Sequence, residues 1–408
     1  MKFGVIWHKH TANLGDDIQA YAAYHLLPKV DYMIDREEID NFESENNEPV
    51  AVLMAGWWFW HKWNWPPAKC IVPYLTSMHI NDYDIYTKGT PVKDEWLQGI
   101  GGEYIKRYGP FGARDYVTLE KFKNLGFDTY FSGCITLTLP KQKETPDKGE
   151  YVCFVDLNPT IKKKAYELVE GTGLRVVELS HDCHYKNSDA TLEERFQVVE
   201  DYLTLYQNAK CVITRRLHVT LPCLAMGVPV LSIVGIDSPG NWTRWRPYTD
   251  YTTFVSNKDF IEGNFEYDVM NPPENKKDYL EVRNNIIAGV NEFVAKYENN
   301  TQTVEELDRM SEYSQEEVKK WQYDLMRFTL DKWLSDSRGM MKKYNTAKDK
   351  AQKLDKELKT MKEKEKQYKE KEKQYKDELE KKKEYIKKLE KTNIRVNLKK
   401  IYKKVVKK

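Results

Sequence analysis

The stretch CVITRRLHVTLPCLAMGVPVLSI, residues Cys211–Ile233, decides the fold of this chain. A short apolar run, Cys211–Thr214, leads through two arginines and a histidine into a helix-length apolar segment, His218–Met226. A Gly and a Pro then precede a second apolar run, Val230–Ile233. A strand, a helix and a strand in this order are typical of an α/β domain with a parallel sheet.

The same alternation fills most of the chain in two blocks. A linker rich in Lys, Pro and acidic residues, Pro140–Gly149, separates the blocks. We therefore expect two α/β domains with mainly parallel sheets, over residues 1–140 and 150–275. Because such sheets bind ligands at the carboxyl ends of their strands, the site is expected in the cleft between the domains. The other expected strands are Phe3–Trp7, Val50–Met54, Tyr74–His79, Ile85–Tyr86, Thr129–Phe131, Tyr151–Val155 and Arg175–Leu179, and the other expected helices are Ile18–Leu27, Val117–Leu125, Ile161–Glu170 and Leu192–Gln207.

Charge divides the 408 residues into two parts. Residues 339–408 hold 27 Lys and Arg against 12 Asp and Glu, a net charge of +15, whereas residues 1–338 hold 38 against 51, a net charge of −13. The acidic part argues against nucleic acid as a partner. No stretch reaches the ~18 apolar residues of a membrane-spanning helix. Six cysteines without a CxxC pair and no signal-peptide pattern predict reduced thiols in a cytoplasmic protein, either free or peripheral on the cytosolic face of the membrane.

The C-terminal third has the pattern of continuous helix. Residues 276–338 predict amphipathic helices over Tyr279–Tyr297 and Val304–Trp333 that pack on the two domains. Residues 339–391 have heptad-like apolar spacing with charged core positions, which predicts a coiled coil, with dimerisation left open, or a single helix acting as a spacer. Residues 392–408 carry seven basic and no acidic residues, with apolar positions at helical spacing. This pattern is typical of a helix on an anionic membrane surface, the alternatives being a solvated tail or a nonspecific nucleic-acid contact.

Two segments of the first block could face a ligand. NLGDDIQA, Asn13–Ala20, offers a turn, a candidate Asp cap and the N–H groups of a helix start, although an ordinary capped helix has the same pattern. WWFWHKWNWPP, Trp57–Pro67, holds five tryptophans and His61. Indole rings suit sugar faces or lipid headgroups, and the alternative is a patch of the core.

Two further segments carry arginines at helix starts. In GPFGARDY, Gly109–Tyr116, a cation beside a helix N-terminus makes sense if an anion binds there, unless Arg114 forms a structural pair with Asp115 or a neighbour. In the decisive stretch, Arg216 offers a rigid fork of donors for carboxylate or phosphate. His218 titrates near neutral pH and can move protons, unless it is a structural histidine. The pair in HDCH, His181 and His184, is read as loop, and no metal site is expected.

These segments together resemble the polysaccharide pyruvyl transferases over roughly residues 1–256. The resemblance rests on NLGDDIQA, on NWPP of Asn64–Pro67, and on the order and spacing of three longer segments: GPFGARDYVTLEKFKNLGF, FSGCITLTL and RLHVTLPCLAMGVPVL. It implies two Rossmann-like domains in a GT-B arrangement, here followed by the long helical or coiled-coil extension. Many family members have Asp-Pro where this chain reads Gly133-Cys134, so no role is carried onto that loop.

The resemblance implies transfer of a pyruvyl group from phosphoenolpyruvate onto two hydroxyls of one sugar, often lipid-linked, at the cytosolic membrane face. It places Arg114, Arg216 and His218 at the donor. We expect His218 and Asp16 to handle protons, and no cofactor or metal. For the sugar or lipid-linked oligosaccharide acceptor we expect Asn13, Asp16, Trp57, Trp58 and His61. Two alternatives stay open: a glycosyltransferase of GT-B shape that uses a nucleotide sugar, and a non-catalytic scaffold tethered to a membrane.

Overall fold

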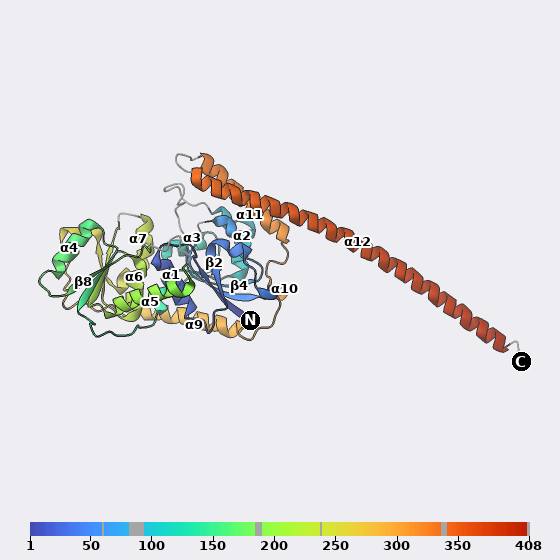
Figure 1. Ribbon diagram of the computed structural model, residues 1–408, viewed down its shortest axis with the longest axis horizontal. Helices are drawn as coiled ribbons and strands as arrows, with labels where there is room; N and C mark the ends of the chain where they lie inside the picture. The colour runs from blue at the N-terminus through green and yellow to red at the C-terminus, as the bar shows by residue number, and fades with distance from the viewer. Residues whose placement is uncertain (59–60, 81–93, 184–189, 237–238, 336–340, 406–408) are drawn as a thin grey trace. The chain divides into compact units, whose positions relative to one another are not determined.

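The computed structural model describes residues 1–58, 61–80, 94–183, 190–236, 239–335 and 341–405 (Figure 1). The expected strand Ile85–Tyr86 lies outside these residues. The chain divides into a body, Met1–Tyr313, and a C-terminal unit made of Ser314–Leu334 and Gly339–Lys408. Within the body, two sheets with helices form the α/β architecture that the sequence predicts.

The body's first sheet has six strands in the order β2-β1-β3-β4-β5-β6, and its second has five in the order β11-β10-β9-β7-β8. Every described pairing of neighbouring strands is parallel, which confirms the expected parallel sheets. The central strands are buried throughout, as in β7 and β9, because helices cover both faces of such sheets. The strands are β1 (Lys2–Trp7), β2 (Tyr32–Asp35), β3 (Val50–Trp58), β4 (Ile71–Ile80), β5 (Phe111–Ala113), β6 (Thr129–Phe131), β7 (Tyr151–Val155), β8 (Arg175–Leu179), β9 (Cys211–Thr214), β10 (Val230–Val234) and β11 (Thr253–Ser256).

The body's helices begin at recognisable caps. The first helix starts four residues before the expected position, because Asn13 and not an Asp accepts the first N–H, from Gly15 at 3.2 Å. Three helices, α2, α7 and α8, were not expected, and in α2 the glycines hide the pattern. Gly102 is required there because a Cβ would lie 2.2 Å from the carbonyl oxygen of Leu97. The helices are α1 (Leu14–Tyr24), α2 (Gly99–Tyr108), α3 (Tyr116–Asn124), α4 (Pro159–Val169), α5 (Leu192–Asn208), α6 (Leu217–Met226), α7 (Pro239–Trp245), α8 (Asn257–Glu262), α9 (Tyr279–Tyr297) and α10 (Val304–Leu307).

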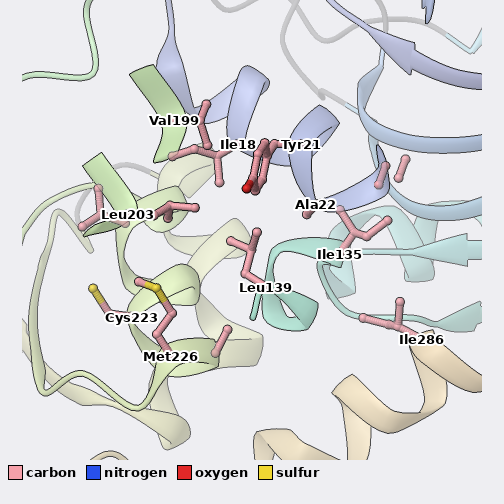
Figure 2. Close-up of a cluster of buried hydrophobic side chains, with 14 of the residues drawn as sticks. Ile18, Tyr21, Ala22, Ile135, Leu139, Val199, Leu203, Cys223, Met226 and Ile286 are labelled. Atoms are coloured by element: carbon pink, nitrogen blue, oxygen red, sulfur yellow. The ribbon is translucent and has the colours of Figure 1, made fainter. Parts of the chain in front are cut away.

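One apolar core joins the elements of both sheets (Figure 2). Ile18 and Tyr21 of α1 face Val199 and Leu203 of α5, and the cluster continues to Met226 of α6. Burying such side chains contributes roughly 1.5–3 kcal/mol each. The shared core therefore fixes the first turn of α1 against the start of α6, and both of these carry predicted site residues.

The helices after residue 275 differ partly from expectation. Helix α9 lies where it was predicted and packs on the body, with Phe293 stacked on Tyr74 at a centroid distance of 5.2 Å. The single helix expected over Val304–Trp333 is instead α10 and α11 (Gln315–Ser335), and most of α11 belongs to the C-terminal unit. The new start has a physical cause, because the Ser314 hydroxyl accepts from Glu317 N while the Glu317 carboxylate accepts from Ser314 N.

The C-terminal unit is dominated by α12 (Met341–Val405), a single helix of 65 residues. It runs through the boundary that the sequence set between residues 391 and 392. Lys362 of α12 pairs with Glu316 of α11 at 3.7 Å, and further along α12 pairs with itself, as between Lys369 and Glu365 at 2.5 Å. Over the described part of the chain, no helix combines the length and apolar character needed to cross a membrane.

Candidate active site

A cavity of about 430 Å³ lies where strands β7 and β9 of the second sheet end. Asn13, which follows β1 of the first sheet, also lines it, so residues after strands of both sheets meet here. This agrees with the expected position at the carboxyl ends of parallel strands. The lining residues are Asn13, Asp156, His181, Arg215, Arg216, Leu217, His218, Arg244 and Trp245.

Backbone hydrogen bonds hold the two sides of the cavity together. Leu14 N donates to His181 O at 2.8 Å, and Cys183 N donates to Ala12 O at 2.7 Å. These bonds flank a bridge between Asn13 and Asp182. The loop after β1 is therefore fixed against the loop after β8, and Asn13 takes its place in the cavity wall.

Arg216 is the residue immediately before helix α6, and a carboxylate holds its side chain in place. Its Nε donates to Asp156 Oδ2 at 2.7 Å, and its Nη2 lies 3.4 Å from Asp182 Oδ1. Burial opposes ionisation of Asp156, but hydrogen bonds from His181 N and the Ser180 hydroxyl and the charge of Arg216 lower its pKa. The Arg216 side chain remains 36% exposed, so its guanidinium is oriented and still accessible from the cavity.

His218 and Arg114 form a buried pair. Arg114 Nη1 lies 3.3 Å from His218 Nε2 and also donates to Gln19 Oε1. Because the guanidinium has only donors, His218 Nε2 acts as the acceptor and the ring proton resides on Nδ1. Burial, with the charges of Arg114 and Arg244, holds the pKa of His218 well below its ordinary value. His218 is therefore neutral at pH 7.

Arg114 does not take the place that the sequence led us to expect. It is fully buried and lies behind His218, outside the set of lining residues. Its Nε and Nη2 have no hydrogen-bond partner among the residues described. The alternative for this arginine was a structural pair with Asp115 or a neighbour: Asp115 caps α3 and pairs with His79 at 2.5 Å, whereas Arg114 contacts Gln19 and His218. Although burial opposes it, His79 lowers the pKa of Asp115 to about 2.

Six lining residues were not among the predicted site residues: Asp156, His181, Arg215, Leu217, Arg244 and Trp245. Arg244 of α7 adds a cation, and burial together with the charge of Arg114 lowers its pKa to about 10. Arg215 has a buried Nε without a hydrogen-bond partner within the described ranges. His181 is buried, its Nε2 lies 2.9 Å from the Tyr206 hydroxyl, and burial lowers its pKa to about 3. The rule that ligands meet strand ends could have found Arg215, which follows β9 directly.

His181 also belongs to the HDCH pair read as loop. It follows β8 as a loop residue, whereas His184 lies outside the described residues. No group of three or more potential metal ligands occurs among the residues that the structure describes.

Asp16, predicted both for proton transfer and for the acceptor, lies outside the cavity wall. Asp16 accepts from the Thr11 hydroxyl at 2.7 Å and lies 3.5 Å from His8 Nδ1. Burial opposes ionisation of Asp16, but His8 and the charge of Arg36 hold its pKa well below the usual range. The negative charge of Asp16 raises the pKa of His218, so the two side chains lie close enough to interact. Asp16 does not line the cavity.

The Trp-rich segment is partly core. Trp63 and Trp65 are buried, in agreement with the alternative of a core patch. His61 Nδ1 lies 3.0 Å from Glu37 Oε2. Burial raises the pKa of Glu37, but the contact with His61 and the charge of Arg36 outweigh it and lower that pKa to about 2. Trp57 and Trp58 end strand β3, but their side chains lie outside what the structure describes. Their contact with an acceptor stays a prediction.

Comparison with solved structures gives remote similarities. An uncharacterised protein of Klebsiella pneumoniae is 13% identical with a TM-score of 0.35, over 62% of this chain and 92% of that one. The UDP-GlcNAc 2-epimerase of Methanocaldococcus jannaschii is 11% identical with a TM-score of 0.37, over 70% and 98% of the two chains. The heptosyltransferase of E. coli is 12% identical with a TM-score of 0.32, over 65% and 100%.

Comparison with curated proteins and with protein families gives one match. No curated protein matches the chain significantly. The family model described as polysaccharide pyruvyl transferase matches residues 13–238, which is more than half of the chain and includes Asn13, Arg114, Arg216 and His218. The chain therefore belongs to the polysaccharide pyruvyl transferase family.

Proposed function

We propose that the protein is a ketal-pyruvyltransferase that moves the pyruvyl group of phosphoenolpyruvate onto two hydroxyls of one sugar and releases phosphate. Besides the family match, the observation that carries this proposal is the concentration of cations at one cavity. Arg215, Arg216 and Arg244 line it and Arg114 lies directly behind His218. A cavity with this charge suits a small ligand with several negative groups.

The carboxylate and phosphate of phosphoenolpyruvate can accept hydrogen bonds from arginine nitrogens that otherwise lack a partner. Burying a guanidinium without partners costs free energy. Two nitrogens of Arg114 and the Nε of Arg215 are buried without hydrogen-bond partners in the described part of the chain. We assign the donor's anionic groups to Arg216 and Arg215, with Arg244 and the buried Arg114 contributing charge. Asp156 keeps the Arg216 fork oriented before the donor arrives, which lowers the entropy lost on binding.

The reaction requires two proton transfers that His218 and a second group can perform. One sugar hydroxyl adds to the central carbon of phosphoenolpyruvate, its proton leaves, and the terminal methylene gains a proton to become a methyl group. The second hydroxyl then attacks the same carbon, the carbon–phosphate oxygen bond breaks, and the second proton leaves with phosphate. Neutral His218 can accept the first proton on Nε2 once that nitrogen leaves its contact with Arg114, and the donor's negative charge beside it favours the protonated ring that returns the proton. Asp16 is the second acid/base group in this scheme.

The acceptor is proposed to be a surface-polysaccharide precursor, lipid-linked and reached at the cytosolic membrane face. We place its hydroxyls toward Asn13 and Asp16, and its sugar ring toward Trp57, Trp58 and His61. Asn13 supports this placement because it lines the donor cavity from the first-sheet side. The chemistry as written uses neither a metal nor a cofactor.

The proposal is tested by acceptor-dependent phosphate release. The full-length protein is incubated with phosphoenolpyruvate and lipid-linked oligosaccharides extracted from cells, and the ketal methyl group is sought by NMR. We expect phosphate and ketal in equal amounts, both lost in His218→Gln and kept in His25→Gln, which changes an exposed histidine at the end of α1. Phosphate release that is equal without acceptor, or equal in His218→Gln, would contradict this mechanism.

A further inference from the structure

The last turns of α12 combine exposed apolar and basic side chains. Leu398 and Ile401 are each 58% exposed, and Lys399, Lys400 and Lys403 are also exposed. Leu398 and Ile401 are three positions apart, so they lie on one side of the helix, and the three lysines occupy the opposite side at 100° per residue. The end of the helix is therefore amphipathic and has an apolar side in contact with solvent.

The charges of this end differ from those of the middle of α12. In the middle, basic residues pair within the helix, as Lys369 does with Glu365 at 2.5 Å and Lys376 with Glu372 at 2.6 Å. After residue 390 the sequence has no acidic residue. Lys399 and Lys403, four positions apart, therefore repel each other instead of pairing. An anionic surface outside the chain would offset this repulsion.

We propose that the end of α12, residues 392–405, docks on an anionic lipid membrane surface. Leu398 and Ile401 enter the boundary between headgroups and acyl chains, and the lysines contact lipid phosphates. A nucleic acid would satisfy the lysines but would leave both apolar side chains in water. The membrane surface satisfies both features, and the inference does not depend on the reaction proposed for the cavity.

The test is cosedimentation of the full-length protein with phosphatidylcholine vesicles, with and without about one-third phosphatidylglycerol. We expect binding to the anionic vesicles alone and release at high salt, because charge attraction is screened. Both Leu398→Ser/Ile401→Ser and Lys399→Gln/Lys400→Gln/Lys403→Gln should lower the partition constant at least tenfold. Tyr375→Ser/Leu379→Ser is the matched control, since it removes exposed apolar side chains from the charge-paired middle of the same helix.

Three outcomes would overturn the proposal. The first is failure of the full-length protein to bind anionic vesicles, and the second is an equal loss of vesicle binding in the control variant. The third is binding to duplex DNA that competes with vesicles and is unaffected by Leu398→Ser/Ile401→Ser. Circular dichroism checks that each variant keeps its helix. Calorimetric titration of phosphoenolpyruvate into the same variants should be unchanged, which separates failure of this inference from failure of the proposed reaction.

Discussion

The close approach of Gly15 to His218 gives a sharp prediction about how the site is held together. A Cβ on Gly15 would lie 2.8 Å from His218 Nδ1 and 3.1 Å from His218 Cβ. Ordinary contacts begin at 3.4 Å, so Gly15→Ala needs about 0.6 Å more room at the ring. Turning the ring does not relieve the second contact, because His218 Cβ is bonded to the backbone. Helix α1 and the start of α6 must therefore move apart.

Overpacking of this kind costs about 1–3 kcal/mol of unfolding free energy. In a His218→Gly background both the ring and its Cβ are absent and the added methyl group has space, so the same change should cost close to nothing. The difference between the two backgrounds is the interaction energy of the pair, again about 1–3 kcal/mol. Donor affinity should fall in Gly15→Ala as well, because displacing the ring moves a residue of the cavity wall and disturbs its 3.3 Å contact with Arg114.

The assay is urea unfolding of four proteins: wild type, each single variant and the double variant. Tryptophan fluorescence reports on the body, where the core joins α1 and α6. We expect the Gly15→Ala cost in the wild-type background alone. An equal cost in both backgrounds, or no cost in either, would refute the described packing of Gly15 on His218.

Three further predictions follow from the charges of the body. Arg114→Met removes a cation that lowers the pKa of His218, so NMR titration of the ring should find that pKa raised; an unchanged value would contradict the contact. Burial lowers the pKa of His181 from 6.5 to about 3 in the folded state. Below pH 6.5 the unfolded state therefore binds the proton first, and the free energy of unfolding falls as the pH is lowered, by up to ~1.4 kcal/mol per pH unit for this group. Urea unfolding between pH 6.5 and 5 should show that the free energy of unfolding changes less steeply with pH in His181→Gln than in wild type. An equally steep change in the variant would count against the burial of His181 as a neutral ring. Arg195→Met breaks a buried ion pair with α1 and should lower the free energy of unfolding by about 3–5 kcal/mol. Arg175→Met breaks an exposed pair and should lower it by less than about 1 kcal/mol. Similar unfolding midpoints for the two variants would contradict the buried contact.

Much of the fold could be predicted because the central strands of parallel sheets are continuous apolar runs. Tyr151–Val155 and Cys211–Thr214 have the same bounds in the structure as in the prediction. Two of the missed strands, β2 and β11, lie at sheet edges and are only partly buried, so their sequences carry a weaker apolar signal. The third, β5, is buried but has only three residues, too few to show a strand pattern. The gap between α10 and α11 depends on a cap at Ser314, which a periodicity argument overlooks.

The site could be predicted where it depends on local sequence and could not where it depends on packing. Arg216 and His218 follow a buried strand directly, and both line the cavity as expected. Arg114 also follows a strand, but its burial behind His218 results from the contact between α1 and α6, which no local pattern encodes. Arg244 reaches the cavity because α7 returns to it after β10, and the two are separated by residues without a distinctive motif.

The central claim is that this cavity binds phosphoenolpyruvate, and calorimetric titration of the full-length protein tests it most directly. Wild type should bind phosphoenolpyruvate saturably, and Arg216→Ala should bind it about 10- to 150-fold more weakly, since a hydrogen bond to a charged group contributes about 1.5–3 kcal/mol. Arg175→Ala, which removes an exposed arginine elsewhere on the second sheet, should bind like wild type. Binding of a UDP-sugar without binding of phosphoenolpyruvate, or equal affinity in wild type and Arg216→Ala, would contradict the account.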